Sequence, residues 1–312
     1  MFAIDAHGVR KLYGQFAALD GVDLAIREGE VFSLLGPNGA GKTTFVEICE
    51  GFRQRSGGEV RILGADPANG NAAWRARLGI VLQSTSVFDE LTVDEVVTHF
   101  ASFYPAPLEV GRVLGMVGLE DRRKARCGKL SGGQKRRVDL AIGIVGDPEL
   151  IFLDEPTTGL DPQARRQVWD VVREFVSLKK TVLLTTHYLD EAETLAERVG
   201  VIIAGKLVEV GTPATLGGRE QEAAVVSFRA TGALAGVPLP AELDSVARDE
   251  DGLMSISTMR PTETVSCLSA WAGRNGEREL PALIVRRPTL EDIYLELIAR
   301  HAPASAVEGA AR

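Results

Sequence analysis

The sequence is poor in the features that mark secreted, disulfide-bonded and membrane-spanning proteins. Its 312 residues include only three cysteines, Cys49, Cys127 and Cys267, too few and too scattered for a disulfide framework or a zinc site. This usage fits a reducing cytoplasm. The opening residues MFAIDAHGVRKLYG contain no apolar core of signal-peptide length, and no apolar run approaches the roughly 20 residues that span a bilayer. If the protein acts at a membrane, we expect another chain to supply the membrane part.

The sequence also lacks an excess of basic residues. Its 35 Lys and Arg are outnumbered by 43 Asp and Glu, which gives a net charge of −8. Proteins that bind duplex nucleic acid usually carry a basic surface, so we expect no nucleic-acid partner. With 45% hydrophobic and 25% charged residues, the composition is that of a globular protein. The length allows one large domain and a smaller one.

Short apolar runs alternate with segments of helical period from about residue 1 to residue 212. This alternation predicts an α/β fold with a largely parallel sheet. Three runs, VFSLL (31–35), LIFL (150–153) and TVLLTT (181–186), are apolar nearly throughout, as strands buried on both faces are. Polar or Gly-rich residues follow each run. Ligands of open α/β sheets bind at the carboxyl ends of the strands, so we expect these three segments to meet at one edge.

The organisation around this sheet can also be predicted. We expect residues 1–215 to form one domain that starts with several β elements and contains a helical insertion at about 90–145. The composition changes at 216–223, which indicates a linker. Residues 224–300 are expected to form a small α/β accessory domain, and the Ala-rich tail 301–312 to be disordered.

A phosphate-binding loop is predicted at GPNGAGKTT, which satisfies the pattern G-x-x-x-x-G-K-[ST]. Its glycines allow successive backbone N–H groups to face a phosphate. Lys42 adds a positive charge toward the β- and γ-phosphates, and the Thr43 hydroxyl can bind Mg²⁺. A buried strand precedes the loop and a helical segment follows it, so we expect a nucleoside triphosphate to bind here. The expected binding residues are Gly36, Pro37, Asn38, Gly39, Ala40, Gly41, Lys42, Thr43 and Thr44.

Two adjacent carboxylates, Asp154 and Glu155, end the second apolar run. Acids after a buried strand are costly unless they handle a cation or a proton. Beside a phosphate loop, Asp154 is expected to hold Mg²⁺ and Glu155 to polarise a water for attack on the γ-phosphate. The alternative is a pair of acids that stabilises the start of the next helix.

The motifs, in their order, resemble those of ATP-binding cassette (ABC) ATPases, the motor subunits of ABC transporters. GPNGAGKTT matches the Walker A loop, LIFLDE (150–155) Walker B, LSGGQ (130–134) the signature sequence and TTGLD (157–161) the D-loop. The resemblance covers residues 1 to about 215. It implies a P-loop NTPase fold with a mixed core sheet, an antiparallel β subdomain and a helical subdomain, and it implies that ATP is the nucleotide. It also implies that Tyr13 stacks on adenine, that Gln83 is the Q-loop residue that also binds Mg²⁺, and that His187 contacts the γ-phosphate. The guanine-reading pattern N-K-x-D is missing, which disfavours a GTPase.

The signature stretch KLSGGQKRR (129–137) looks like a second anion site. Its residues alone indicate an anion-friendly helix start followed by a solvated face made of Lys135, Arg136 and Arg137. In ABC ATPases two cassettes pair head to tail. The resemblance therefore implies that Ser131, Gly132 and Gly133 contact the γ-phosphate of ATP held by a second copy of the chain or by a paralogue. Gln134 of the signature and Asp161 of the D-loop are also expected to bind the nucleotide.

Residues 131–162 are similar to the drug- and antibiotic-resistance subfamily of bacterial ABC exporters, and RRPTLEDIYLELI (286–298) resembles the C-terminal motif of that subfamily. The similarity implies a separately encoded ABC-2-type permease, bound through the helical insertion and the loop around Gln83 on the inner face of the cell membrane. Two alternatives remain: a clamp ATPase in DNA repair or translation, and a regulatory module that binds ATP without useful hydrolysis. The single cassette and the acidic charge disfavour the first; Glu155 and His187 disfavour the second.

Overall fold

The structure is a computed structural model that describes residues 1–83, 88–244, 247–250 and 252–301. The chain divides into two units, residues 1–213 with the end of the last helix from Ile298, and residues 214–297. The domain boundaries expected from the sequence stay predictions. The expected disordered tail lies, from residue 302 on, outside the described residues. Within the described ranges, no helix has the length and apolar character needed to cross a bilayer.

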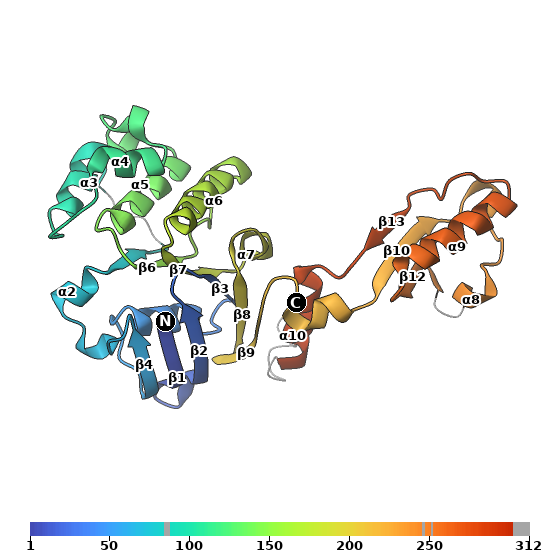
Figure 1. The fold of residues 1–312 in the computed structure, drawn as a ribbon, viewed down its shortest axis with the longest axis horizontal. Coiled ribbons are helices and arrows are strands. Elements are labelled where there is room, and N and C mark those ends of the chain that lie inside the picture. The colour runs from blue at the N-terminus through green and yellow to red at the C-terminus, as the bar shows by residue number, and fades with distance from the viewer. Residues whose placement is uncertain (84–87, 245–246, 251, 302–312) are drawn as a thin grey trace. The chain divides into compact units, whose positions relative to one another are not determined.

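Two sheets form the framework of the first unit (Figure 1). Its strands are β1 Phe2–Tyr13, β2 Phe16–Arg27, β3 Val31–Leu35, β4 Gly57–Ile62, β5 Leu78–Val81, β6 Leu150–Asp154, β7 Thr181–Thr186, β8 Arg198–Ile203 and β9 Lys206–Gly211. The larger sheet has the order β5-β6-β7-β3-β8-β9; its strands are parallel except β9, which is antiparallel to β8. The smaller sheet, β2-β1-β4, is antiparallel. The three apolar runs are β3, β6 and β7, as predicted.

The strand β6 shows why the apolar runs form this sheet. Leu150 and Phe152 pack into one hydrophobic cluster, whereas Ile151 and Leu153 pack into another. Successive side chains of a strand point to opposite faces, so β6 is the wall between two cores and must be apolar at each of these positions. Full burial of such a side chain stabilises the fold by roughly 1.5–3 kcal/mol.

Helices cover the larger sheet and form the expected insertion. They are α1 Lys42–Cys49, α2 Ala72–Arg75, α3 Val93–Ala101, α4 Val110–Met116, α5 Gly132–Ile144, α6 Pro162–Ser177 and α7 Leu189–Leu195. Figure 1 shows α3, α4 and α5 gathered into a helical layer. Thr92 starts α3 with a capping box, in which its hydroxyl accepts from Glu95 N and the Glu95 side chain reaches back.

The second unit is the small α/β module expected from the sequence. Its elements are β10 Ala224–Arg229, α8 Ala241–Asp244, β11 Ala247–Glu250, β12 Leu253–Thr258, α9 Pro261–Arg274 and β13 Ile284–Arg286, followed by α10 Leu290–His301. The strands form an antiparallel sheet in the order β11-β12-β10-β13. The helix α9 packs on this sheet, with the ring of Trp271 edge-on to Phe228 at 5.9 Å. The fold class predicted from the sequence is confirmed: a mixed core sheet, an antiparallel β subdomain, a helical subdomain and a C-terminal module.

Candidate functional site

Four adjacent parallel strands deliver the predicted catalytic segments to one edge of the larger sheet. Gln83 follows β5, Glu155 follows β6, His187 follows β7 and the phosphate loop follows β3. Because these strands are neighbours in the order β5-β6-β7-β3, segments far apart in the chain meet at their carboxyl ends. The sequence predicted this convergence for three strands, and β5 adds the fourth.

The phosphate loop is held in shape by close backbone approaches that only glycine permits. A Cβ on Gly36 would stand 2.3 Å from the carbonyl oxygen of Ile202 in β8. At Gly41 the backbone has φ +107°, and a Cβ would lie 2.5 Å from the carbonyl oxygen of Ala18. Gly41 leads directly into α1, whose first N–H groups lack partners within the helix and can bind an anion.

Lys42 places its ammonium at the centre of the site. Its Nζ donates to the carbonyl oxygens of Gly36 at 2.7 Å and Pro37 at 3.3 Å, and it lies 3.9 Å from Glu155 Oε1. Burial lowers the pKa of Lys42, while the negative charges of Glu155 and Asp154 act in the opposite direction. The cation therefore stands between the loop and the two carboxylates.

Glu155 is the residue on which the strand ends converge. Its Oε2 accepts from Gln83 Nε2 and from Thr158 Oγ1, both at 3.1 Å. Its Oε1 lies 3.3 Å from His187 Nδ1, in addition to the contact with Lys42. The backbone of Glu155 has φ +44°, in the left-handed region that side chains other than glycine seldom adopt. Such local strain concentrates at functional sites.

Asp154 is placed as a ligand for a cation. It is 8% exposed; Oδ1 accepts from Thr185 Oγ1, and Oδ2 lies 3.5 Å from Thr43 Oγ1. Gln83 uses its amide nitrogen on Glu155, which leaves the amide oxygen to face a cation. Within the described residues, no group of three or more His, Cys, Asp or Glu gathers as a metal cage. A single carboxylate with hydroxyl and amide oxygens fits Mg²⁺, which takes few protein ligands and completes its shell with water and phosphate oxygens.

The signature residues Ser131, Gly132 and Gly133 lie apart from this cluster, at the N-terminus of α5. Ser131 and Gln134 form a capping box: Gln134 N donates to Ser131 Oγ at 3.3 Å, and Ser131 N donates to Gln134 Oε1 at 3.0 Å. Ser131 and Gly132 are exposed. The Ser131 hydroxyl accepts in this box, so its proton remains available for an outside acceptor.

Tyr13 and Asp161 also lie outside the cluster around Glu155. Tyr13 is 43% exposed at the end of β1, with Lys11 Nζ at 5.1 Å and the Arg53 guanidinium at 5.5 Å from its ring centre. A ring in this setting can offer a face to a base. Asp161 caps α6, since its Oδ1 accepts from the backbone N–H groups of Gln163 and Ala164, both at 2.9 Å.

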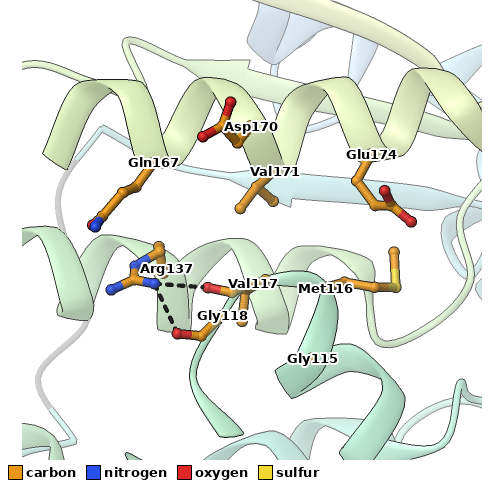
Figure 2. Close-up of a pocket in the computed structure, with 9 residues that line it drawn as sticks. All are labelled: Gly115, Met116, Val117, Gly118, Arg137, Gln167, Asp170, Val171 and Glu174. Carbon is orange, nitrogen blue, oxygen red and sulfur yellow. Dashed lines mark hydrogen bonds between the residues drawn. The ribbon is translucent and has the colours of Figure 1, made fainter. Parts of the chain in front are cut away.

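One expectation is wrong: Arg136 and Arg137 are not on a solvated helix face. Arg136 is 5% exposed, and its guanidinium donates to three backbone carbonyls. Arg137 donates through Nη1 to the carbonyls of Val117 at 3.1 Å and Gly118 at 2.8 Å, beside a hollow of about 440 Å³ lined by α6 (Figure 2). Burial lowers the pKa of each guanidinium. Arginine stems often lie along apolar surface; here the guanidinium of Arg136 is enclosed as well, whereas Arg137 is half-buried.

Two hydroxyls that support the acids were not predicted. Thr185 in β7 donates to Asp154 and accepts from Glu155 N at 3.1 Å, and Thr158 donates to Glu155. The polar pair that ends the run TVLLTT is the only signal in the sequence that points to Thr185.

The sequence of the chain is similar to those of known proteins. A family profile described as "ABC transporter" matches residues 19–158. The chain is 37% identical to the daunorubicin resistance ATP-binding protein DrrA2 of Streptomyces coeruleorubidus over 95% of both proteins. It is 34% identical to the Nod factor export ATP-binding protein I of Rhizobium sp. (strain N33), over 96% of this chain and 97% of that protein.

Solved structures extend the likeness to three dimensions. An ATP-binding cassette of an ABC transporter in its ADP conformation matches with a TM-score of 0.61 at 25% identity, over 68% of this chain and 91% of that one. The dimeric, post-hydrolysis state of another cassette, bound to ADP and Pi, matches with a TM-score of 0.60 at 27% identity, over 67% of this chain and 98% of that one.

Proposed function

The chain belongs to the ATP-binding cassette transporter family, and on this premise we propose that it is the motor subunit of an ABC-2-type exporter of drugs, antibiotics or other hydrophobic compounds. As an ATP-binding subunit of the exporter type, it is an ATPase that converts ATP and water to ADP and phosphate. It acts as a dimer with a transmembrane partner. We further propose that the dimer consists of two copies of this chain and that it lies on the inner face of the cell membrane.

The observation that carries this proposal is the convergence on Glu155 of Lys42, Gln83 and His187, each from the end of a different strand. A carboxylate that meets an ammonium, an amide and an imidazole is suited to orient a water and take its proton. In the mechanism that follows, the loop N–H groups and Lys42 hold the β- and γ-phosphates. Glu155 activates the water, and His187 steadies the γ-phosphate as its charge changes.

Mg²⁺ is the metal that this site would take. Thr43, Gln83 and Asp154 would hold it, and the bound ion would neutralise part of the phosphate charge. Tyr13 would stack on the adenine.

The signature residues complete the site of the second copy. Ser131 and Gly132 offer exposed polar groups at the start of α5, next to the buried Gly133, and the Ser131 proton is free to be donated to a γ-phosphate. Gln134 holds Ser131 in this orientation, and Asp161 holds the segment that precedes α6. In a head-to-tail dimer of this chain, each ATP would be enclosed by the phosphate loop of one copy and the signature of the other.

The permease is proposed to dock on an apolar hollow of about 240 Å³ next to Gln83. Its walls come from β5, from the loop before α3, from α3 and from α5; they are Ile80, Val81, Leu82, Phe88, Phe100, Asp139 and Ile142. Leu82 is 56% exposed there, and the rings of Phe88 and Phe100 meet edge-on at 5.6 Å. An exposed apolar hollow beside a catalytic loop suits a helix from a membrane subunit.

The ATPase mechanism is tested with Glu155→Gln, which keeps the shape of the side chain and removes its basicity. We expect ATP binding to persist, hydrolysis to fall at least about 100-fold, and ATP to trap a dimer that elutes early in size-exclusion chromatography. Glu149→Gln is the matched control, because Glu149 stands at the opposite end of β6 and pairs with Arg77 on the surface. Turnover near the wild-type rate in Glu155→Gln would remove Glu155 from this role.

The permease contact is tested by co-purification with an ABC-2-type membrane protein, sought among the neighbouring reading frames. Leu82→Asp is expected to abolish co-purification, because a charge in the hollow must be desolvated when a helix covers it. Phe52→Asp changes a residue that is 81% exposed and does not line the hollow, so it should co-purify normally. Equal recovery of the permease with both variants would place the contact elsewhere.

A further inference from the structure

Arg136 joins three separate segments of the first unit through a single guanidinium. Its Nε donates to the carbonyl oxygen of Pro156 at 2.7 Å, and its Nη2 donates to that of Asp154 at 3.2 Å. Its Nη1 donates to the carbonyl oxygen of Leu82. The residue stands in the second turn of α5, the helix that begins with the signature residues.

These three carbonyls have particular places in the chain. Asp154 and Pro156 are the residues immediately before and after Glu155, and Leu82 immediately precedes Gln83. Gln83 Nε2 in turn donates to Glu155 Oε2. Arg136 therefore fixes the backbone at both ends of the hydrogen bond between Gln83 and Glu155.

The structure assigns Arg136 as a positioning residue for the ATPase reaction: its guanidinium holds Glu155 and Gln83 in register with the signature helix. This role rests on the function proposed above. It adds a link between Glu155, which acts on the ATP bound by its own copy, and α5, whose signature residues serve the ATP of the second copy. A displacement of α5 when a second copy engages Ser131 would pull on the backbone beside Glu155 and Gln83 together.

The geometry suits arginine in particular. The guanidinium presents five N–H donors in a rigid fork, so one side chain can serve three carbonyls at fixed angles. Glu155 needs such support because its backbone lies at φ +44°. On its other side, Glu155 N donates to Thr185 O and to Thr185 Oγ1, both at 3.1 Å. Hydrogen bonds with β7 on one side and with α5 on the other therefore hold the backbone around Glu155.

Arg137 provides a matched comparison on the same helix. It also donates to two backbone carbonyls, but these belong to Val117 and Gly118 after α4, inside the helical layer (Figure 2). A loss of fold stability is therefore expected from the removal of either guanidinium. Of these two arginines, only Arg136 donates to the backbone next to Glu155 and Gln83.

The test measures kcat and KM for ATP, ATP binding and thermal unfolding of the full chain and of Arg136→Gln, Arg136→Lys and Arg137→Gln. We expect Arg136→Gln to lower kcat by about 10- to 100-fold with KM changed by less than about 3-fold, because small misplacements of reacting groups have effects of this size. Arg137→Gln should lower the Tm by a similar amount with a much smaller change in kcat. Arg136→Lys keeps the charge without the fork and should fall between wild type and Arg136→Gln.

The possible outcomes separate a positioning role of Arg136 from a purely structural one. A kcat in Arg136→Gln no lower than in Arg137→Gln, at a similar loss of Tm, would reduce Arg136 to a structural residue and overturn the inference. If Arg136→Gln does not fold, Arg136→Lys is the deciding variant. Wild-type turnover in Arg136→Lys would show that the three guanidinium hydrogen bonds are not needed and would overturn the inference. An inactive wild-type chain would instead count against the ATPase function itself, so the two failures can be told apart.

Discussion

Thr185 offers a direct test of how the fold holds the catalytic acids. It lies opposite Asp154 on the last rung of the β6–β7 ladder and is fully buried. Its hydroxyl donates to Asp154 Oδ1 and accepts from Glu155 N at 3.1 Å. Thr185→Val keeps the branched shape of the side chain but removes both roles of the hydroxyl.

The expected loss in the free energy of unfolding follows from the two hydrogen bonds of the Thr185 hydroxyl. A hydrogen bond to a charged group contributes about 1.5–3 kcal/mol, and Asp154 would lose this donor in a nearly buried position. Glu155 N keeps its bond to Thr185 O, so the second loss is small. We therefore expect Thr185→Val to lower the free energy of unfolding by about 2–3 kcal/mol. Thr185→Ser keeps the hydroxyl and loses one methyl group, which amounts to about 1 kcal/mol.

Chemical denaturation of the two variants and the wild type, at constant m-value, measures these differences. The order of stability should be wild type, then Thr185→Ser, then Thr185→Val. A Thr185→Val protein within about 0.5 kcal/mol of wild type, or less destabilised than Thr185→Ser, would refute the view that the hydroxyl supports the acids.

Two further predictions concern the phosphate loop and the helix behind it. Burial, with the charges of Asp154 and Glu47, raises the pKa of Glu50 to about 8 from 4.5, so between these pH values the folded chain keeps a proton that the unfolded chain releases. The free energy of unfolding should then fall as the pH rises through this window, by roughly 3–5 kcal/mol in denaturant titrations, and Glu50→Gln should flatten the slope. An equal slope in that variant would contradict the prediction. Gly36→Ala should lower stability by about 3 kcal/mol and abolish ATP binding, since its Cβ would strike Ile202 O. Gly39→Ala, with φ +78° and open space around the added atom, should lose only about 1–2 kcal/mol; equal losses in both would exclude the clash as the cause.

Much of the candidate site could be predicted because its signals are local. A strand buried on both faces must be apolar at nearly every position, so VFSLL and TVLLTT mark β3 and β7 residue by residue. Backbone approaches to Ile202 and Ala18 require glycine at positions 36 and 41 of the phosphate loop, and this need shows in the spacing GPNGAGK. The family resemblance supplied Gln83 and His187, and the structure brings both to Glu155.

Other features depend on partners that are distant in the chain. The run KRR has the local pattern of a solvated face, yet Arg136 is buried because carbonyls 18 to 54 residues away converge on it. No local rule indicates such a convergence. Thr185 was missed for the same reason, since its partner Asp154 is 31 residues away along the chain and only the pairing of β6 with β7 brings them together.

The alternation of β6 between two hydrophobic clusters also protects the chemistry against misalignment. A slip of one residue relative to β7 would turn Leu150 and Phe152 toward the wrong cluster and expel Ile151 and Leu153 from theirs. The same slip would carry Asp154 away from Thr185. A one-residue misalignment that misplaces Asp154 therefore also disrupts two packed clusters, so the packing of the core stabilises the register that the site requires.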